Sequence, residues 1–479
     1  LPKDSTGVPQ PLLAQVKKYY ETIPFKPHPL HWNHSVHLTK QLCVYLTGGE
    51  LKQLRGHEVL NGILGGSMRR IELSSSAGPY CKYLYKVQNK ETLFKVDISN
   101  PSLTRYAWDL EKPAARAVYA DYNKIMDAWS CGKPTGLVGQ DVPKVELLAT
   151  EDVDKGKLRL FVVCDLALNL ALRKYFGSFI DSLHSRSLNT PFKIGWNPYL
   201  FPYYISLNER DGYKIVSIDI KRQDKNMNKE FVKVLCDIVC SCYKDPCPMD
   251  FDAIATTMSR MVHIHGGVIY WQEGGNPSGN YLTTVLNTIC TFIGLVYAFS
   301  ARFEEKYHKL PSLPDFLTLV NPAGIGDDLR YAYHPDIDLN FEYVASKFYD
   351  LGFEIVQDKG GIDPPPIHRG ILCSRFFVWD DDLNIIMPPL KKRSIIQQLH
   401  YANLKDKGLF NEIVQGVVFE ASLRDEEFFN KIIREAHIQL KRMKMRLSDC
   451  RIAPYHAYTE HLAKYQRGEV SSPLVTSNG

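Results

Sequence analysis

The stretch GIGDDLRY (residues 324–331) places two adjacent carboxylates behind a glycine and between apolar residues. It predicts a tight β-hairpin, because Gly326 permits the turn and apolar residues alternate after it. Asp327 and Asp328 would then stand at the tip of the hairpin. Adjacent carboxylates repel each other unless a cation holds them. The pair therefore indicates a cation site, provided that the rest of the sequence supplies a partner carboxylate.

A partner carboxylate lies near the end of another expected strand. The segment YKIVSIDI (213–220) is rich in β-branched residues and predicts a strand that delivers Asp219. If this strand neighbours the hairpin in one antiparallel sheet, Asp219 and Asp327 come within reach of shared cations. Mg²⁺ is usually held by one or two such carboxylates plus substrate phosphates, and two ions about 4 Å apart can align an attacking oxygen and a leaving pyrophosphate. The alternative is that each aspartate is simply an exposed residue at a strand end.

Length and composition limit the class of protein. With 479 residues the chain is too long for one compact core, so two or three lobes are expected. Hydrophobic content of 44% and charged content of 23% indicate a globular protein, and a net charge of +5 permits an anionic partner without requiring one. The sequence has no apolar run of about 18 residues, so no membrane span is predicted. It lacks an initiator Met, which favours a processed product or a fragment.

The eleven cysteines include no CxxC pair, which favours reduced thiols in a cytoplasmic setting over a disulfide framework. Four of them lie close together in the sequence: Cys236, Cys240, Cys242 and Cys247. They could form a zinc site, or Cys236 and Cys240 could lie on one face of a helix that is followed by a loop. Their spacing favours the helix, because it fits no usual zinc pattern. The segment HWNHSVHLTKQL (31–42) holds three histidines without a further ligand group. A solvated loop or a structural role is expected there.

The remaining patterns predict an α+β core with appended lobes. The first 150 residues indicate short helices and loops, and the pattern from Met387 onward indicates a separate helical region. Between these parts, the apolar spacing predicts a strand and then a helix in 157–185, a long buried helix in 280–310, a shorter amphipathic helix in 339–353, and a mobile tail over 467–479.

Two further segments suit close contact with another molecule. GGNPSGNYLTTVLNT (274–288) is a glycine-rich loop that feeds into a helix with polar residues Ser278, Thr283 and Asn287, although capping or buried hydrogen bonds would also explain them. In DKGKLRLF (154–161), Lys155, Lys157 and Arg159 alternate. They predict either a cationic stripe for a triphosphate or a solvated strand edge.

Taken in chain order, these motifs resemble those of the RNA-dependent RNA polymerases of positive-strand, picornavirus-like viruses. The likeness covers about residues 75–380 and extends more weakly into MPPLKKRSI and FEASL. It implies an α+β, right-hand polymerase that carries out template-directed RNA synthesis by two-metal nucleotidyl transfer. It also implies fingers at 1–176 with an insertion at 259–276, a palm at 177–258 and 277–380, a helical thumb at 381–465 and a flexible tail at 466–479.

The resemblance also implies roles for single residues. Asp219, Asp327 and Asp328 would bind two Mg²⁺ ions, for which Mn²⁺ can substitute, and Lys359 in LGFEIVQDKG would protonate the leaving pyrophosphate. Asp224, in the D-x4-D pattern DIKRQD, would sense the ribose 2′-hydroxyl. The other implied nucleotide-binding residues are Lys144, Lys157, Arg159, Ser278, Thr283 and Asn287. The implied RNA-binding residues are Ser75, Ser76, Gly78, Pro79 and Tyr80 of SSAGPY, and Arg375 of ILCSRFFV.

Some positions depart from the family pattern. Ile325 stands where Tyr is usual, Leu148 and Asp152 stand where basic residues are usual, and Leu1 replaces the Gly with which the picornavirus enzymes begin. Pro322 is expected to limit the length of its strand, because proline cannot donate to a sheet. These departures indicate a distant relative.

The expected partners follow from the resemblance. They are template and primer RNA, nucleoside triphosphates, a genome-linked protein primer and other viral replication proteins, at replication complexes in the host cytoplasm. A reverse transcriptase shares the palm carboxylates but should lack the pair Asp224 and Asn287. A catalytically decayed RNA-binding scaffold is the third alternative, and the presence of all three palm carboxylates weighs against it.

Overall fold

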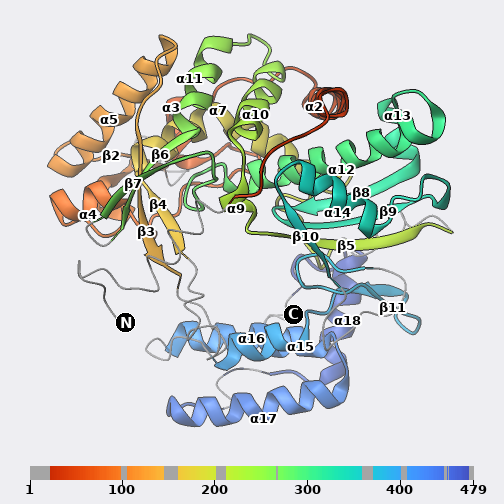
Figure 1. Ribbon diagram of the computed structural model, residues 1–479. Helices are drawn as coiled ribbons and strands as arrows, with labels where there is room; N and C mark the ends of the chain where they lie inside the picture. The colour runs from red at the N-terminus through yellow and green to blue at the C-terminus, as the bar shows by residue number, and fades with distance from the viewer. Residues whose placement is uncertain are drawn as a thin grey trace, which may run out of the picture.

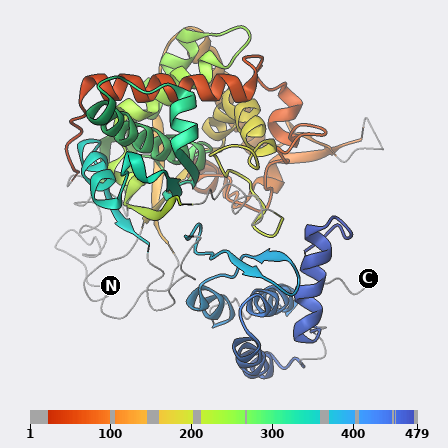
Figure 2. The same ribbon diagram turned by 90° about the vertical axis from the view of Figure 1, so that its right-hand side faces the viewer.

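The structure is a computed structural model that describes residues 22–98, 105–144, 160–200, 212–265, 268–358, 370–400, 407–446, 450 and 452–473. Figure 1 shows two sheet-based parts side by side, with a group of helices beneath them, and Figure 2 shows the same three parts from the side. Each sheet has four strands. This arrangement agrees with the predicted α+β core and its appended helical lobe.

The sheet that carries the predicted carboxylates, here called the palm sheet, has the strand order β10–β5–β9–β8 and is antiparallel throughout. Its strands are β5 (Lys214–Lys221), β8 (Val320–Ile325), β9 (Asp328–Tyr333) and β10 (Glu354–Gln357). β8 and β9 form the predicted hairpin, and Gly326 at its turn has φ +63°, a conformation that favours glycine. The expectation that the strand of Asp219 neighbours this hairpin is confirmed, since β5 pairs with β9.

Helices cover one face of the palm sheet. Val216, Ile218 and Ile220 of β5 and Leu329 of β9 are buried in the main core, together with most of helix α12. The helices of this part are α2 (Pro29–Thr47), α9 (Gln223–Asn226), α10 (Lys229–Ser241), α11 (Pro248–Met258), α12 (Thr283–Tyr307), α13 (Leu313–Leu319), α14 (Phe341–Asp350) and the short η2 (Pro335–Ile337). α12 is apolar and long enough to cross a membrane, but 94% of its most apolar window is buried inside the protein. This length and this apolar composition are those of the buried core helix that is predicted within 280–310.

The second sheet, here called the fingers sheet, has the strand order β4–β3–β6–β7. Its strands are β3 (Leu137–Pro143), β4 (Leu160–Cys164), β6 (Arg260–His265) and β7 (Val268–Glu273). The elements around it are α3 (Gly56–Asn61), α4 (Pro79–Tyr85), η1 (Lys90–Leu93), β1 (Phe94–Asp97), β2 (Arg105–Trp108), α5 (Pro113–Ser130) and α7 (Leu166–Ser185). β4 and α7 are the strand and helix predicted within 157–185. β6 and β7 belong to this sheet, and they lie within residues 259–276, where the fingers insertion is expected.

The histidine-containing segment is a helix, not a loop. α2 spans 19 residues, and its buried residues, including Leu38, Leu42 and Leu46, recur at helical spacing. Histidines and polar residues between them conceal this spacing in the sequence. His31 Nε2 bonds Glu304 Oε2 at 2.6 Å and His34 Nε2 bonds the Pro311 carbonyl at 2.7 Å, so the structural role is the one observed. Long α2 and α5 also correct the expectation of only short helices before residue 150.

The expectation that Pro322 shortens its strand is wrong. β8 runs through Pro322 because it is an edge strand of the palm sheet. Gly324, two residues later and therefore in the same orientation, donates its N–H outward to the Pro191 carbonyl at 2.9 Å. The missing N–H of the proline thus lies on the side of the strand that forms no bonds with β9.

The crowded cysteines form no metal site in the part of the chain that the structure describes. Cys236 and Cys240 lie on α10 and are buried in the core, as the helix-face alternative predicts. No group of three or more His, Cys, Asp or Glu side chains among the described residues is arranged to hold a metal ion. All eleven cysteines are free thiols.

The C-terminal helices form a separate core. The helices α15 (Lys392–His400), α16 (Lys407–Ser422), α17 (Glu426–Arg442) and α18 (Tyr455–Gln466) bury a common set of apolar side chains, as predicted for the region after Met387. A small hairpin of β11 (Val378–Asp380) and β12 (Ile385–Met387) precedes them. Arg375, just before this hairpin, pairs with Glu420 of α16 at 2.6 Å, and both side chains are almost buried, with exposures of 11% and 8%. This ion pair ties the helical lobe to the segment that leaves the palm.

Breaking this ion pair should destabilise the protein. Glu420→Gln leaves the buried Arg375 guanidinium without its counter-charge, so we expect a loss of ~3 kcal/mol in the free energy of unfolding, measured by urea denaturation. Asp237→Asn is the matched control, because the Lys40–Asp237 pair is exposed by 34% and 59%; its expected cost is below about 1 kcal/mol. Equal losses in the two variants would contradict this assignment.

Candidate active site

The register of the palm sheet brings the predicted carboxylates together. In the pairing of β5 with β9, Asp219 lies directly opposite Asp328, and the Ile220 N–H donates to the Asp327 carbonyl at 3.2 Å. Opposite residues of an antiparallel pair point to the same face, with Cβ atoms about 5 Å apart. Because Ile218, Ile220 and Leu329 fill the helix-covered face, Asp219 and Asp328 lie on the other face.

A fourth carboxylate and a lysine extend this cluster. The N–H of Asp358, the residue after β10, donates to the Ser217 carbonyl of β5 at 2.9 Å. Lys391 Nζ lies 2.8 Å from Asp358 Oδ2, and both side chains are largely buried. Sequence reasoning used neither residue, although Lys391 lies in the quoted MPPLKKRSI. Their contact joins the end of the palm sheet to the start of the helical lobe.

The carboxylates repel one another strongly enough to alter protonation. Burial first, and then the charges of Asp327, Asp219 and Asp358, raise the pKa of Asp328 to about 7, while Lys391 acts in the opposite direction. Their side chains are not already gathered around one point, since the described residues include no ready-made metal group. The donor set nevertheless fits a hard divalent cation, because all its ligands are carboxylate oxygens and a cation would relieve their repulsion.

Polar residues of α12 hold the carboxylate turn. The Gly326 N–H donates to Thr288 Oγ1 at 2.8 Å, and Thr291 Oγ1 donates to the Gly326 carbonyl at 2.7 Å. The buried Gln223 donates to Thr291 Oγ1 at 2.8 Å. Sequence reasoning missed these residues, because a threonine in an apolar helix gives no sign of which turn it bonds. They fix the backbone immediately before Asp327.

The two residues predicted to sense the ribose contact each other. Asn287 Nδ2 donates to Asp224 Oδ1 at 2.7 Å. Asn276 Nδ2 donates to Asn287 Oδ1 at 2.7 Å, and Asn280 Nδ2 donates to Asn276 Oδ1 at 2.8 Å. The last two asparagines lie in the quoted glycine-rich loop but were not singled out there. This chain of amides fixes the orientation of the Asn287 side chain and so of the Asp224 carboxylate.

Ser278 and Thr283 make local hydrogen bonds. Ser278 Oγ accepts from the Val162 N–H of β4 at 3.1 Å, which joins the loop to the fingers sheet. Thr283, the first residue of α12, donates its hydroxyl to the Pro277 and Asn280 carbonyls, each at 3.0 Å. Both residues thus shape the loop between the two sheets. Their contact with a nucleotide stays a prediction.

The predicted RNA-contacting residues fall into two places. The SSAGPY segment leads into α4, with Gly78 at φ +93° and the Tyr80 N–H donating to Asp165 Oδ1 at 3.2 Å. Ser76 is exposed and Ser75 is half-buried. Arg375 instead makes four hydrogen bonds inside the protein, to Glu420 twice, to the Pro388 carbonyl and to the Tyr199 hydroxyl. These bonds support a structural role for Arg375 rather than a direct contact with RNA.

The remaining predicted residues concern the triphosphate channel. Lys144 follows β3 and is exposed. Lys157, Arg159 and Lys359 lie outside the described residues. Their roles therefore stay predictions.

Comparison with known proteins identifies the class. A solved structure titled "Sicinivirus 3Dpol RNA dependent RNA polymerase" superimposes with a TM-score of 0.71, covering 93% of this chain and 87% of that chain at 17% identity. The fold is therefore that of a right-hand polymerase. A family model described as viral RNA-dependent RNA polymerase matches residues 3–440, and the chain belongs to this family.

Curated relatives agree at 23–25% identity. The RNA1 polyprotein of Red clover mottle virus is 25% identical over 383 residues, which are 75% of this chain and 19% of that polyprotein. The RNA1 polyprotein of Arabis mosaic virus (isolate NW) is 25% identical over 63% of this chain and 14% of its own length. The replicase polyprotein of Acute bee paralysis virus (strain Rothamsted) is 23% identical over 69% and 18%. The chain thus spans less than a fifth of these relatives, and it is a distant member of the picornavirus-like type.

The raised pKa of Asp328 should make metal binding release protons near neutral pH. At a pKa of about 7 the carboxyl is partly protonated at pH 7, and only its deprotonated form binds a cation. We expect calorimetry with Mn²⁺ in two buffers of different ionisation enthalpy to show proton release at pH 7 but none at pH 9. Asp328→Asn should remove the release. Equal release at both pH values would contradict the assignment.

The same group should make the metal-free protein less stable as the pH rises. Asp328 binds its proton more tightly in the folded chain than in the unfolded chain, where an aspartate has a pKa of about 3.9. The stabilising contribution is therefore complete below about pH 4 and is lost as the pH rises through about 7. Saturating Mg²⁺ should flatten this dependence in thermal melts.

Proposed function

We propose that this chain synthesises RNA on an RNA template by nucleotidyl transfer, replicating a positive-strand viral RNA genome. In this reaction the 3′-hydroxyl of a primer attacks the α-phosphate of a base-paired nucleoside triphosphate, and pyrophosphate leaves. The observation that carries the proposal is the pairing of Asp219 with Asp328, beside the turn that holds Asp327. It brings carboxylates from two distant segments to the same face of the palm sheet, opposite the helices, within a polymerase fold.

The carboxylates would hold the metal. Asp219 and Asp327 would be the principal ligands and Asp328 would support them, for two Mg²⁺ ions or for Mn²⁺ in their place. When bound, such ions neutralise phosphate charge and align the attacking and leaving oxygens. Thr288 and Thr291 contribute by fixing the turn at Gly326, so that the position of Asp327 is set before substrate arrives.

The hydrogen-bonded pair Asp224 and Asn287 supports a ribonucleotide substrate. A carboxylate held by an amide can accept a hydrogen bond from a ribose 2′-hydroxyl, which a deoxyribose cannot offer. This pair weighs against the reverse transcriptase alternative. Lys144, Lys157 and Arg159 would bind the triphosphate, Ser278 and Thr283 would line the sugar side, and Lys359 would protonate the pyrophosphate.

Template and primer RNA would be held mainly through their backbones, since base pairing selects the sequence. The SSAGPY segment (75–80) would contact the template. We infer further that the chain is released from a polyprotein, acts at replication complexes in the host cytoplasm, and works with a genome-linked protein primer and other replication proteins. The polyprotein nature of the relatives supports the first of these inferences.

Removing Asp327 should abolish synthesis without unfolding the protein. We expect Asp327→Ala to lower nucleotide incorporation on a primed RNA homopolymer with Mg²⁺ by ~10³-fold, since a ligand of the cation is worth several kcal/mol to the transition state. Asp381→Ala, in the exposed acidic run at the β11–β12 hairpin, is the matched control and should retain activity. Normal incorporation by Asp327→Ala would refute the metal role. A lack of activity in both the Asp327→Ala and the Asp381→Ala variants would favour the scaffold alternative.

Asp224→Ala should reduce sugar selection. Loss of a charge-assisted hydrogen bond costs roughly 1.5–3 kcal/mol, so the preference for ribonucleotides over deoxyribonucleotides should fall by about 10–100-fold. The ratio of kcat/KM for the two substrates measures this effect. An unchanged ratio in a folded variant would count against Asp224 as the ribose sensor.

A further inference from the structure

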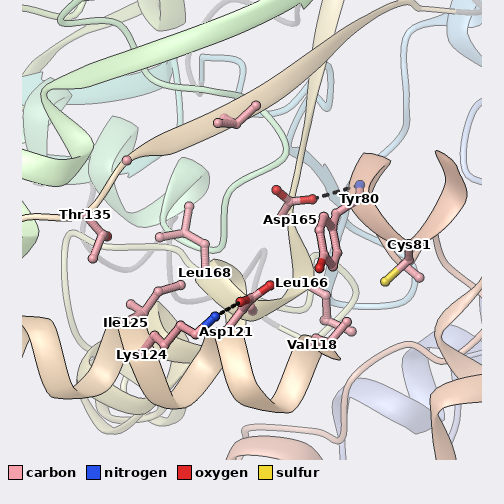
Figure 3. A pocket seen from close by; sticks show the side chains of 14 residues that line it. Tyr80, Cys81, Val118, Asp121, Lys124, Ile125, Thr135, Asp165, Leu166 and Leu168 are labelled. Carbon is pink, nitrogen blue, oxygen red and sulfur yellow. Dashed lines mark hydrogen bonds and ion pairs between the residues drawn. The ribbon is translucent and has the colours of Figure 1, made fainter. Parts of the chain in front are cut away.

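A pocket that is partly open to solvent lies behind the SSAGPY segment, away from the carboxylates of the palm sheet. It is a cavity of about 270 Å³ between α4, α5, β3 and the start of α7 (Figure 3). Most of its wall is apolar and includes Val118, Ile125, Leu166 and Leu168. A cavity of about 150 Å³ holds benzene, so this one has room for roughly ten non-hydrogen atoms.

Two carboxylates reach this cavity from opposite walls. Asp165 stands just before α7, and Asp121 lies on α5 (Figure 3). Asp165 Oδ1 accepts the Tyr80 N–H at 3.2 Å. Asp121 pairs at 3.2 Å with Lys124, which also lines the cavity; the lysine side chain is 77% exposed, so solvent screens this contact. The cavity therefore presents two carboxylates and one solvent-exposed ammonium group beside an apolar wall.

The electrostatic surroundings select a cation. Burial and the charge of Asp121 both raise the pKa of Asp165, and burial, followed by the charges of Asp165 and Asp121, raises the pKa of the Cys81 thiol beside them. An anion such as an RNA phosphate would add to this repulsion, whereas a positive group would relieve it. An apolar wall next to two carboxylates matches a molecule with one charged end and one ring.

We propose that this cavity binds a small organic cation, a protonated primary amine that carries one aromatic ring. The ammonium group lies between Asp121 and Asp165. The ring packs against Val118, Ile125 and Leu168. Three N–H donors and nine or ten non-hydrogen atoms satisfy the polar groups and fill the volume.

Binding in this cavity would also affect the SSAGPY segment, which is predicted to contact the template. Ala77 and Tyr80 of the SSAGPY segment form part of the cavity wall, and Asp165 holds the backbone of Tyr80. An ammonium group that competes for Asp165 weakens this hold and shifts the segment. This consequence, unlike the binding itself, rests on the proposed polymerase function.

Binding is tested directly on the full chain. Phenethylamine is titrated at pH 7.5 and followed by ligand-observed NMR, with the isosteric neutral 2-phenylethanol as the matched compound. We expect phenethylamine to bind with a Kd of about 1 mM, at least tenfold more tightly than the alcohol. Asp165→Asn and Asp121→Asn should each weaken it about tenfold or more. Asp127→Asn, an exposed residue of the same helix outside the cavity, should leave it unchanged.

The measurements distinguish failure of the binding site, failure of its link to the template and failure of the polymerase function. Equal binding of the alcohol, equal binding by both cavity variants, or no binding at all would overturn the site. If Asp165→Asn does not fold, Asp121→Asn decides alone. In primer extension, phenethylamine should raise the KM for template without changing that for nucleotide. Binding without this effect would overturn the link to the template, and failure of the polymerase function would show instead as no extension even without phenethylamine.

Discussion

The site depends on the antiparallel pairing of β5 with β9, which sets Asp219 opposite Asp328. This pairing places like charges on neighbouring strands, where burial and then the repulsion between these charges raise the pKa of Asp328. Hydrophobic packing on the other face of the sheet holds the arrangement, because a register shift of one residue would move Ile218 and Ile220 out of the core. The core thus stabilises an acidic surface that is unfavourable by itself and that a divalent cation would complete.

The buried helix α12 connects the parts of this site. Its first turns contribute Asn287 to the contact with Asp224, and Thr288 and Thr291 to the carboxylate turn. The loop before it bonds the fingers sheet through Ser278. One rigid element therefore positions both the predicted ribose sensor and the predicted metal ligand. We infer that substitutions within these turns affect sugar selection and catalysis together.

Much of this arrangement could be predicted from the sequence. The hairpin, the strand of Asp219 and the long apolar helix each carry a strong local pattern. The register of Asp219 with Asp328, and the threonines that hold Gly326, could not be predicted, because they depend on contacts between distant segments. α2 was missed because its histidines hide its apolar spacing. The resemblance of ILCSRFFV to a family motif assigned Arg375 to RNA, and the sequence does not reveal the buried pair with Glu420, because that partner lies in another lobe.

The most direct test of the central claim is a crystal structure of the protein with Mn²⁺ and a nucleoside triphosphate. Anomalous scattering would locate the manganese in it. The account predicts manganese bound jointly by Asp219 on β5 and Asp327 at the neighbouring turn, in contact with the triphosphate. Manganese absent from this face, or held by only one of the two segments, would contradict it.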